Sequence, residues 1–119
     1  MTFGQLNDQE TQQSSAPDVT GLVSGALDAA NFLKAWGNEG RLTILCYLTS
    51  GPKSVTALEK LLDSRQAAVS QPLARLRLEG LVEARREGQA IFYSIRDPKV
   101  TAAIKCLAAL YGVAETSAD

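Results

Sequence analysis

Hydrophobic residues recur every three or four positions over most of this chain, the spacing that gathers them on one face of a helix. These apolar stripes predict helices over Val19–Trp36, Leu42–Leu48, Val55–Leu62, Gln66–Leu78 and Val100–Tyr111. The second stripe is followed by Ser50-Gly51-Pro52 and the third by Asp63-Ser64, which are residues that end helices. The pattern therefore predicts a mostly helical chain.

The helical pattern stops at Gly80, and the next residues have the composition of two short strands. Leu81–Arg86 and Ala90–Ile95 are the predicted strands, and Glu87-Gly88-Gln89 supplies a glycine for the turn between them. Helix, tight turn, helix and hairpin in this order are typical of a winged helix-turn-helix domain. We therefore expect a mostly α fold with a small β-hairpin wing, in the element order α-α-α-α-β-β-α.

The fourth predicted helix carries a polar stripe beside its apolar one. Gln and Ser side chains can pair with base edges in the major groove of DNA, which is wide enough for one helix. We expect base contacts from Gln66, Ala67, Ser70 and Gln71, and contacts to the backbone or minor groove from Arg75, Arg77, Arg85, Arg86 and Gln89. Arg77 has an alternative, an ion pair with Glu79 or Glu83. The plain alternative for the whole stripe is the solvated face of an ordinary amphipathic helix.

Local charge favours the nucleic-acid interpretation, although the chain as a whole is not basic. Its 12 Lys and Arg residues against 13 Asp and Glu residues give a net charge of −1. Between positions 65 and 86, five arginines stand against two glutamates. Attraction to phosphates supplies most of the non-specific affinity for DNA, so here it must come from this basic segment.

A set of short motifs spans roughly residues 29–111. They are Leu33-Lys34-Ala35, Asn38-Glu39-Gly40-Arg41-Leu42-Thr43-Ile44-Leu45, Val69-Ser70-Gln71, Leu73-Ala74-Arg75-Leu76-Arg77, Gly80-Leu81-Val82 and Tyr93-Ser94-Ile95. Together they resemble the ArsR/SmtB family of small bacterial winged-helix repressors. The resemblance implies a homodimer that joins through its first and last helices and represses by occupying a near-palindromic operator in double-stranded DNA. Candidate interface residues are Leu22, Trp36, Leu107 and Tyr111, and packing inside the protomer explains each of them equally well.

Pro72 departs from the family pattern, because it stands where a residue with a backbone donor is usual. Proline inside a helix removes a hydrogen bond and clashes with the carbonyl four residues back, at a cost of about 3 kcal/mol if the helix does not adjust. We predict a bend or a local loosening at this position. The alternative is a shorter helix that starts at Gln71-Pro72, since proline is favoured in a first turn.

The 119 residues support one small domain. We expect this domain over residues 19–112, between a disordered N-terminal tail at 1–18 and a mobile C-terminal tail at 113–119. Thr2–Pro17 lacks the charged start and apolar run of a secretory signal, and no apolar run is long enough to span a membrane. We therefore expect a cytoplasmic protein without a membrane partner.

Metal sensing and enzymatic catalysis find little support in the sequence. The chain has no histidine, and neither Val55-Thr56-Ala57-Leu58-Glu59 nor the last helix offers the ligand clusters by which the family's metal sensors bind their ions. A His-based catalytic dyad is impossible, and no glycine-rich phosphate loop is present. We therefore expect neither a metal nor a cofactor. A winged helix that serves only protein interaction would not need its concentration of arginines.

The two cysteines, Cys46 and Cys106, are the candidates for signal sensing. A thiol pair far apart in a cytosolic chain indicates redox chemistry or core packing rather than a structural disulfide. Cys46, in the setting Thr43-Ile44-Leu45-Cys46, resembles the first cysteine of a family subgroup that responds to reactive sulfur species or oxidants. In that subgroup the second cysteine directly follows the last tyrosine, where this chain has Gly112.

Cys106 lies six residues before that position, which turns it toward a different face of the helix. Whether its sulfur can meet Cys46 stays open, because a disulfide needs Cα atoms within about 7 Å. The alternatives are core packing of both thiols and an unrelated inducer. If Cys46 and Cys106 do sense oxidants, we expect Lys105 or Arg41 to lower a thiol pKa, because the thiolate is the reactive form.

Overall fold

The computed structural model describes residues 16–63 and 66–112. Most of the expected tails, residues 1–15 and 113–119, lie outside this described part. The chain divides into two compact units, Met1–Phe32 and Leu33–Asp119. The second unit contains the helix-turn-helix and the hairpin, and the boundary between the units falls inside the helix α3.

The first unit holds the short helix α2, Thr20–Ser24, and the beginning of α3, Ala26–Trp36. The prediction of one helix over residues 19–36 is wrong at Gly25, where the two helices separate. Glycine in a helix interior costs about 1 kcal/mol relative to alanine. Ser24 adds a competing bond, since its hydroxyl donates to the carbonyl of Gly21 at 3.0 Å.

The helices of the second unit begin at polar capping residues. The helix α4, Glu39–Leu48, starts three residues before the predicted Leu42, because the side chain of Asn38 accepts a hydrogen bond from the Arg41 amide at 3.1 Å. The helix α5, Val55–Leu62, has the predicted bounds; Ser54 caps its start and Asp63, in the left-handed conformation, follows its end. The helix α6 runs over Gln66–Leu78 as predicted. The helix α7, Pro98–Tyr111, starts two residues before the predicted Val100, because the side chain of Asp97 accepts a hydrogen bond from the Lys99 amide at 2.9 Å.

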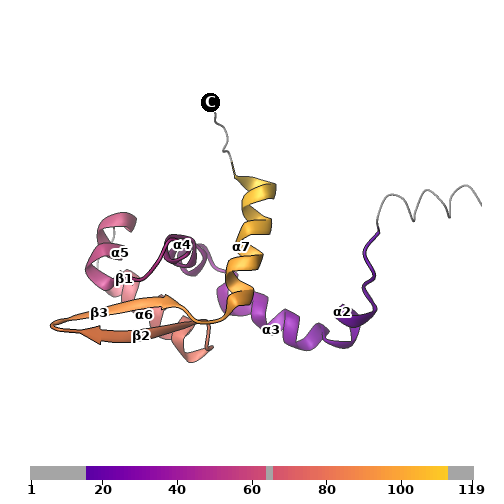
Figure 1. Ribbon diagram of the computed structural model, residues 1–119, viewed down its shortest axis with the longest axis horizontal. Coiled ribbons are helices and arrows are strands. Elements are labelled where there is room, and N and C mark those ends of the chain that lie inside the picture. The colour runs from indigo at the N-terminus through magenta and orange to yellow at the C-terminus, as the bar shows by residue number, and fades with distance from the viewer. Residues whose placement is uncertain (1–15, 64–65, 113–119) are drawn as a thin grey trace, which may run out of the picture. The chain divides into compact units, whose positions relative to one another are not determined.

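Three antiparallel strands form a sheet in the order β1-β3-β2. The hairpin consists of β2, Val82–Glu87, and β3, Ala90–Ile95, and it turns at Gly88, whose φ of 63° suits glycine. Figure 1 shows the hairpin as a long ribbon that extends away from α7. The strand β1, Lys53–Ser54, was not predicted, because two residues are too few to show an alternating pattern.

The core of the second unit lies around α6, which contacts α4, α5 and β2. Its buried apolar residues are Ala35, Trp36, Ile44, Leu45, Leu48, Leu58, Val69, Leu73, Leu76, Leu81, Val82 and Val100. Trp36, a candidate for the dimer interface, is therefore buried within its own protomer. The predicted mostly α fold with a β-hairpin wing is confirmed. Among the described residues, no helix combines the length and the apolar character that crossing a membrane requires.

Candidate nucleic-acid interface and cysteine groove

The helix α6 separates its residues into a buried and an exposed face. Val69, Leu73 and Leu76 are fully buried against the rest of the domain. Gln71 is exposed and Ser70 half-buried, as a face available to base edges requires. Gln66 and Ala67 belong to α6, but their side chains lie outside the described part of the chain.

Pro72 lies inside α6, which continues through it from Gln66 to Leu78. The alternative of a shorter helix starting at Gln71 is therefore wrong. Proline has no N–H, so it cannot donate to the carbonyl of Ala68 four residues earlier. The bend or loosening at this point stays a prediction.

The two arginines of α6 differ in their partners. The guanidinium of Arg75 donates from Nε to Oε2 of Glu79 at 3.0 Å, one helical turn later. The expected alternative, an ion pair of Arg77 with Glu79 or Glu83, is not formed. Arg77 is exposed and makes no ion pair with any residue of the described part. Of the two side chains, Arg77 is thus the one whose charge is uncompensated.

The two arginines of the wing lie on opposite faces of the hairpin, because neighbours along a strand alternate. Arg85 pairs with Phe92 in register and forms an ion pair with Glu87, Nη2 to Oε2, at 2.7 Å. Arg86 stands opposite Ile91 and makes no ion pair with a described residue. Gln89 is exposed at the turn. Adjacent in sequence, Arg85 and Arg86 therefore cannot act as one patch.

A hollow of about 410 Å³ lies between α6 and the wing, lined by Ala74, Arg77, Leu78 and Tyr93. The sequence singled out Tyr93 only as part of a family motif and did not single out Leu78 at all. The signal for Leu78 was its place on the exposed stripe of α6, four residues after Ala74. The signal for Tyr93 was the alternation of β3, which puts it on the same sheet face as Ile91.

Cys46 lines an apolar groove of about 320 Å³ between α4 and α7, with Leu42, Ile104, Leu107, Ala108, Tyr111 and Gly112. The thiol is accessible from solvent, yet partial burial raises its pKa above the ordinary value. The expectation that Arg41 lowers a thiol pKa is wrong for Cys46. The Arg41 guanidinium is engaged elsewhere, donating to the carbonyls of Ala35 at 2.7 Å and Lys34 at 3.3 Å.

Cys106 does not share this groove. The groove-lining residues of α7 form one stripe, and Cys106 lies roughly 150° around the helix from the centre of that stripe. Both cysteines are free and exposed in the single chain, so neither fills the core of its own protomer. Gly112, at the position of the subgroup's second cysteine, does line the groove with Cys46.

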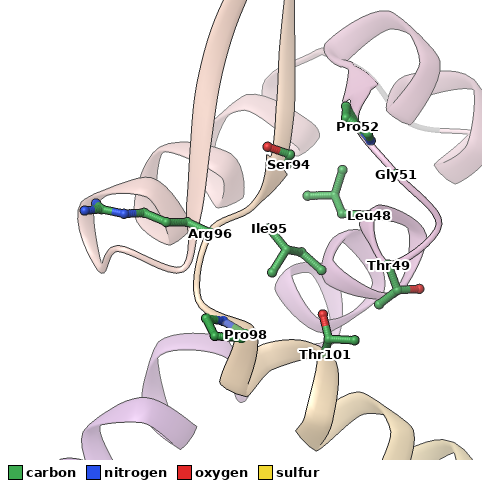
Figure 2. Close-up of a pocket in the computed structure, with 9 residues that line it drawn as sticks. All are labelled: Leu48, Thr49, Gly51, Pro52, Ser94, Ile95, Arg96, Pro98 and Thr101. Carbon is green, nitrogen blue, oxygen red and sulfur yellow. The ribbon is translucent and has the colours of Figure 1, made fainter.

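Another hollow, of about 390 Å³, lies where the end of β3 meets α4 and the start of α7. Figure 2 shows Leu48 and Ile95 pointing into it, whereas the guanidinium of Arg96 extends away from the other lining residues. No charged side chain therefore points into this space. In the described part of the chain, no three His, Cys, Asp or Glu side chains gather closely enough to hold a metal ion.

Comparison with known proteins places this geometry among regulators of transcription. Residues 38–84 match the family described as bacterial regulatory protein, arsR family. Over 106 residues, 41% are identical to the transcriptional activator HlyU of Vibrio cholerae, spanning 89% of this chain and 88% of that protein.

Solved structures of similar proteins agree with this comparison of sequences. The transcriptional repressor BigR from Xylella fastidiosa is similar with a TM-score of 0.76 at 32% identity, covering 80% of this chain and 97% of that one. A homodimeric winged helix-turn-helix DNA-binding domain from Mycobacterium bovis is similar with a TM-score of 0.63 at 28% identity, covering 87% and 99%. These similar proteins are regulators and not enzymes.

Proposed function

We propose, from the premise that this chain belongs to the arsR family of bacterial regulatory proteins, that it represses transcription as a homodimer bound to operator DNA. It is a winged helix-turn-helix transcriptional regulator and not an enzyme. The observation that carries the proposal is the exposed face of α6, which presents Gln71 opposite a fully apolar buried face. Repression is favoured by the similarity to BigR, although the similar HlyU is named an activator.

Dimerisation is supported by exposed apolar side chains on α7. Leu110 and Tyr111 are 74% and 79% exposed in the single chain. Large apolar side chains exposed side by side at a helix end indicate a surface that a partner covers. The similar domain from Mycobacterium bovis is itself homodimeric. In a two-fold dimer, two copies of α6 would meet successive half-sites about one DNA turn apart.

The residues of α6 and of the wing are proposed to make two types of DNA contact, to base edges and to the backbone or minor groove. We assign Gln66, Ala67, Ser70 and Gln71 to base edges in the major groove, and Arg75, Arg77, Arg85, Arg86 and Gln89 to the backbone or minor groove. Replacing Gln71 by Ala is expected to cost about 1 to 3 kcal/mol of discrimination at one base pair.

The first test of this function is binding of the full chain to duplex DNA taken from the region upstream of its own gene, measured by fluorescence anisotropy over a range of KCl concentrations. Phosphate contacts release counterions, so the logarithm of the affinity should fall linearly with the logarithm of the salt concentration. A protein-interaction winged helix would bind neither this duplex nor one of random sequence, even at low salt. Absence of binding to both duplexes would contradict the proposed function.

For the inducer, we propose modification of the Cys46 and Cys106 thiols by reactive sulfur species or oxidants. In support, both thiols are free and exposed, and Cys46 lines a groove against α7, a candidate dimer helix. An adduct on Cys46 would add volume in this groove and bias the dimer away from the DNA-bound arrangement. By thermodynamic linkage, DNA binding would in turn disfavour modification of Cys46. The alternative is an ArsR-type regulator with non-sensing cysteines and another inducer.

Intact mass and cysteine mapping test this proposal after separate exposure to peroxide, a disulfide oxidant and an organic persulfide. A cross-link between Cys46 and Cys106 with loss of DNA binding would identify a dithiol switch. Because Cys46 of α4 lines a groove against one face of α7 and Cys106 lies on another face of α7, such a link within one protomer requires α7 to rearrange. Cys46→Ser and Cys106→Ser should each retain DNA affinity and lose release. Release retained in both variants would leave the inducer to be sought elsewhere.

A further inference from the structure

We infer that the hollow between α6 and the wing, lined by Ala74, Arg77, Leu78 and Tyr93, holds a deoxyribose-phosphate of the DNA backbone, and that Tyr93 and Arg77 bind its phosphate. This assignment rests on the proposed DNA-binding function and adds Tyr93 to the residues that contact DNA. It also separates the arginines without an ion pair among the described residues, Arg77 and Arg86, from those paired with a carboxylate, Arg75 and Arg85.

The hollow lies where a DNA strand must pass. A helix in the major groove has one phosphate backbone on each of its flanks. On α6, the exposed stripe through Ala74 has Arg77 on one flank and Arg75 on the other, about 60° and 100° away around the helix. Arg77 shares the hollow with Tyr93 of β3, so its flank is the one beside the wing. The backbone strand that separates the helix from the wing therefore crosses this hollow.

The charge around the hollow is uncompensated. Arg77 lines it and forms no ion pair with a residue of the described part. Glu79, two residues later in α6, lies on another face of the helix and is paired with Arg75. Arg86 lies on the Tyr93 face of the sheet, since the register places Arg86 opposite Ile91 and Ala84 opposite Tyr93. Two free guanidinium groups thus border the path of one strand.

The opposite sides of α6 and of the wing carry paired arginines. Arg75 is bound to Glu79, and Arg85 is bound to Glu87 on the other sheet face. Exposed pairs of this kind contribute at most about 1 kcal/mol, so they do not lock the side chains. Each carboxylate nevertheless cancels the charge that would attract a phosphate and would repel the phosphate itself. The attraction is therefore concentrated on the side of the hollow.

The walls of the hollow suit a sugar and a phosphate together. Leu78 is 82% exposed, although it is large and apolar, and with Ala74 it offers an apolar surface to the carbon face of a deoxyribose. The phenol of Tyr93 is half-buried and has no hydrogen-bond partner among the described residues, so its hydroxyl is free to donate to a phosphate oxygen. Arginine and tyrosine are both among the side chains that proteins use to contact DNA phosphates.

The test compares variants of the full chain on a random-sequence DNA duplex at low salt, with affinity measured by anisotropy as KCl is raised. Arg77→Gln should weaken binding roughly tenfold and make the slope of log affinity against log salt shallower by about 0.9, the value for one lost phosphate contact. Tyr93→Phe keeps the ring and should weaken binding about two- to tenfold without changing the slope, because a neutral hydroxyl displaces no counterion.

The matched control is the double variant Asp97→Asn with Lys99→Gln, which removes a paired charge of each sign at the start of α7, where no DNA contact is proposed. It should leave both the affinity and the slope close to those of the unchanged protein. An Arg77→Gln variant with an unchanged slope, or a Tyr93→Phe variant with unchanged affinity, overturns the inference while DNA binding by the unchanged protein still stands. Failure of the unchanged protein to bind any duplex overturns the proposed function as well. Melting curves followed by circular dichroism establish that each variant is folded.

Discussion

Single side chains decide which charges of this chain are uncompensated and how readily the Cys46 thiol ionises. Four arginines lie on α6 and β2, yet Glu79 and Glu87 neutralise two of them. The thiol of Cys46 is reachable from solvent, but the apolar walls beside it disfavour the thiolate. In both cases the neighbours of a residue, and not its type, set its chemistry.

For this single side chain we predict that the Cys46 thiol reacts slowly with alkylating and oxidising reagents at neutral pH. Burial raises its pKa, so the thiol stays protonated to a higher pH than a peptide thiol does. In a Cys106→Ser variant, the rate of alkylation by iodoacetamide should rise with pH and reach its midpoint above that of an unstructured cysteine peptide. A midpoint at or below that of the peptide would contradict the prediction, and the Cys46→Ser variant reports Cys106 separately.

A slow-reacting Cys46 bears on the inducer. Peroxide, disulfides and persulfides all react with the thiolate, so a protonated thiol is a poor target for each of them at neutral pH, and what distinguishes them is how well they partition into an apolar groove. An apolar persulfide or a disulfide oxidant can concentrate in the groove. Of the three reagents proposed above, we therefore expect peroxide to modify Cys46 most slowly.

Among the elements, α6 is the helix whose local sequence disfavours its own structure, because Pro72 lies in its interior. Its buried face packs against α4, α5 and β2, and this packing holds the helix together across Pro72. By contrast, Pro98 stands at the start of α7, where its fixed φ suits the first turn and its missing N–H has no intrahelical acceptor to lose. The same residue type is therefore unfavourable in one helix and favourable in the other.

Pro72→Ala should accordingly stabilise the domain by about 1 to 3 kcal/mol, because alanine restores a donor for the Ala68 carbonyl and removes the ring. The measurement is the free energy of unfolding from urea titration of the dimer at fixed protein concentration. Pro98→Ala is the matched control and should be neutral or slightly destabilising. Equal effects of the two substitutions would show that α6 has already relaxed around its proline.

For the whole molecule, one surface is proposed to bind DNA and another a second copy of the chain. Leu78 on α6 and Leu110 on α7 are similarly exposed, at 82% and 74%, so exposure alone does not distinguish their roles. Their surroundings do, since Leu78 stands beside the unpaired Arg77, whereas Leu110 stands beside the exposed Tyr111. The proposed functions of the two surfaces can therefore be separated by one substitution in each.

Leu110→Glu should weaken self-association by at least tenfold, because it places a charge on a surface that the dimer would bury. Leu78→Glu should leave self-association unchanged and weaken DNA binding by repelling phosphate. Sedimentation velocity over a dilution series measures the first effect and anisotropy the second. Identical sedimentation of the Leu110→Glu variant and the unchanged protein would exclude this part of α7 from the interface.

The sequence by itself determined the kinds and positions of the main elements. The apolar periods of α5 and α6 and the glycine after Glu87 are local features, so they predicted those helices and the hairpin turn nearly to the residue. The order of these elements predicted the winged helix-turn-helix fold, and the family motifs agreed with it. Local reasoning missed the break at Gly25, the capping role of Asn38 and the strand β1, whose two residues form a strand only by pairing with β3.

Only the tertiary structure decided which residues act together. The hollow that joins Arg77 to Tyr93, and the position of Arg86 on the Tyr93 face, depend on strand register and on how α6 packs against the sheet. Likewise, the rotation of α7 gave Cys46 a groove with Gly112 and turned Cys106 away from it. The physical reason is range: periodicity and capping act within a few residues, whereas burial and shared cavities join residues distant in sequence.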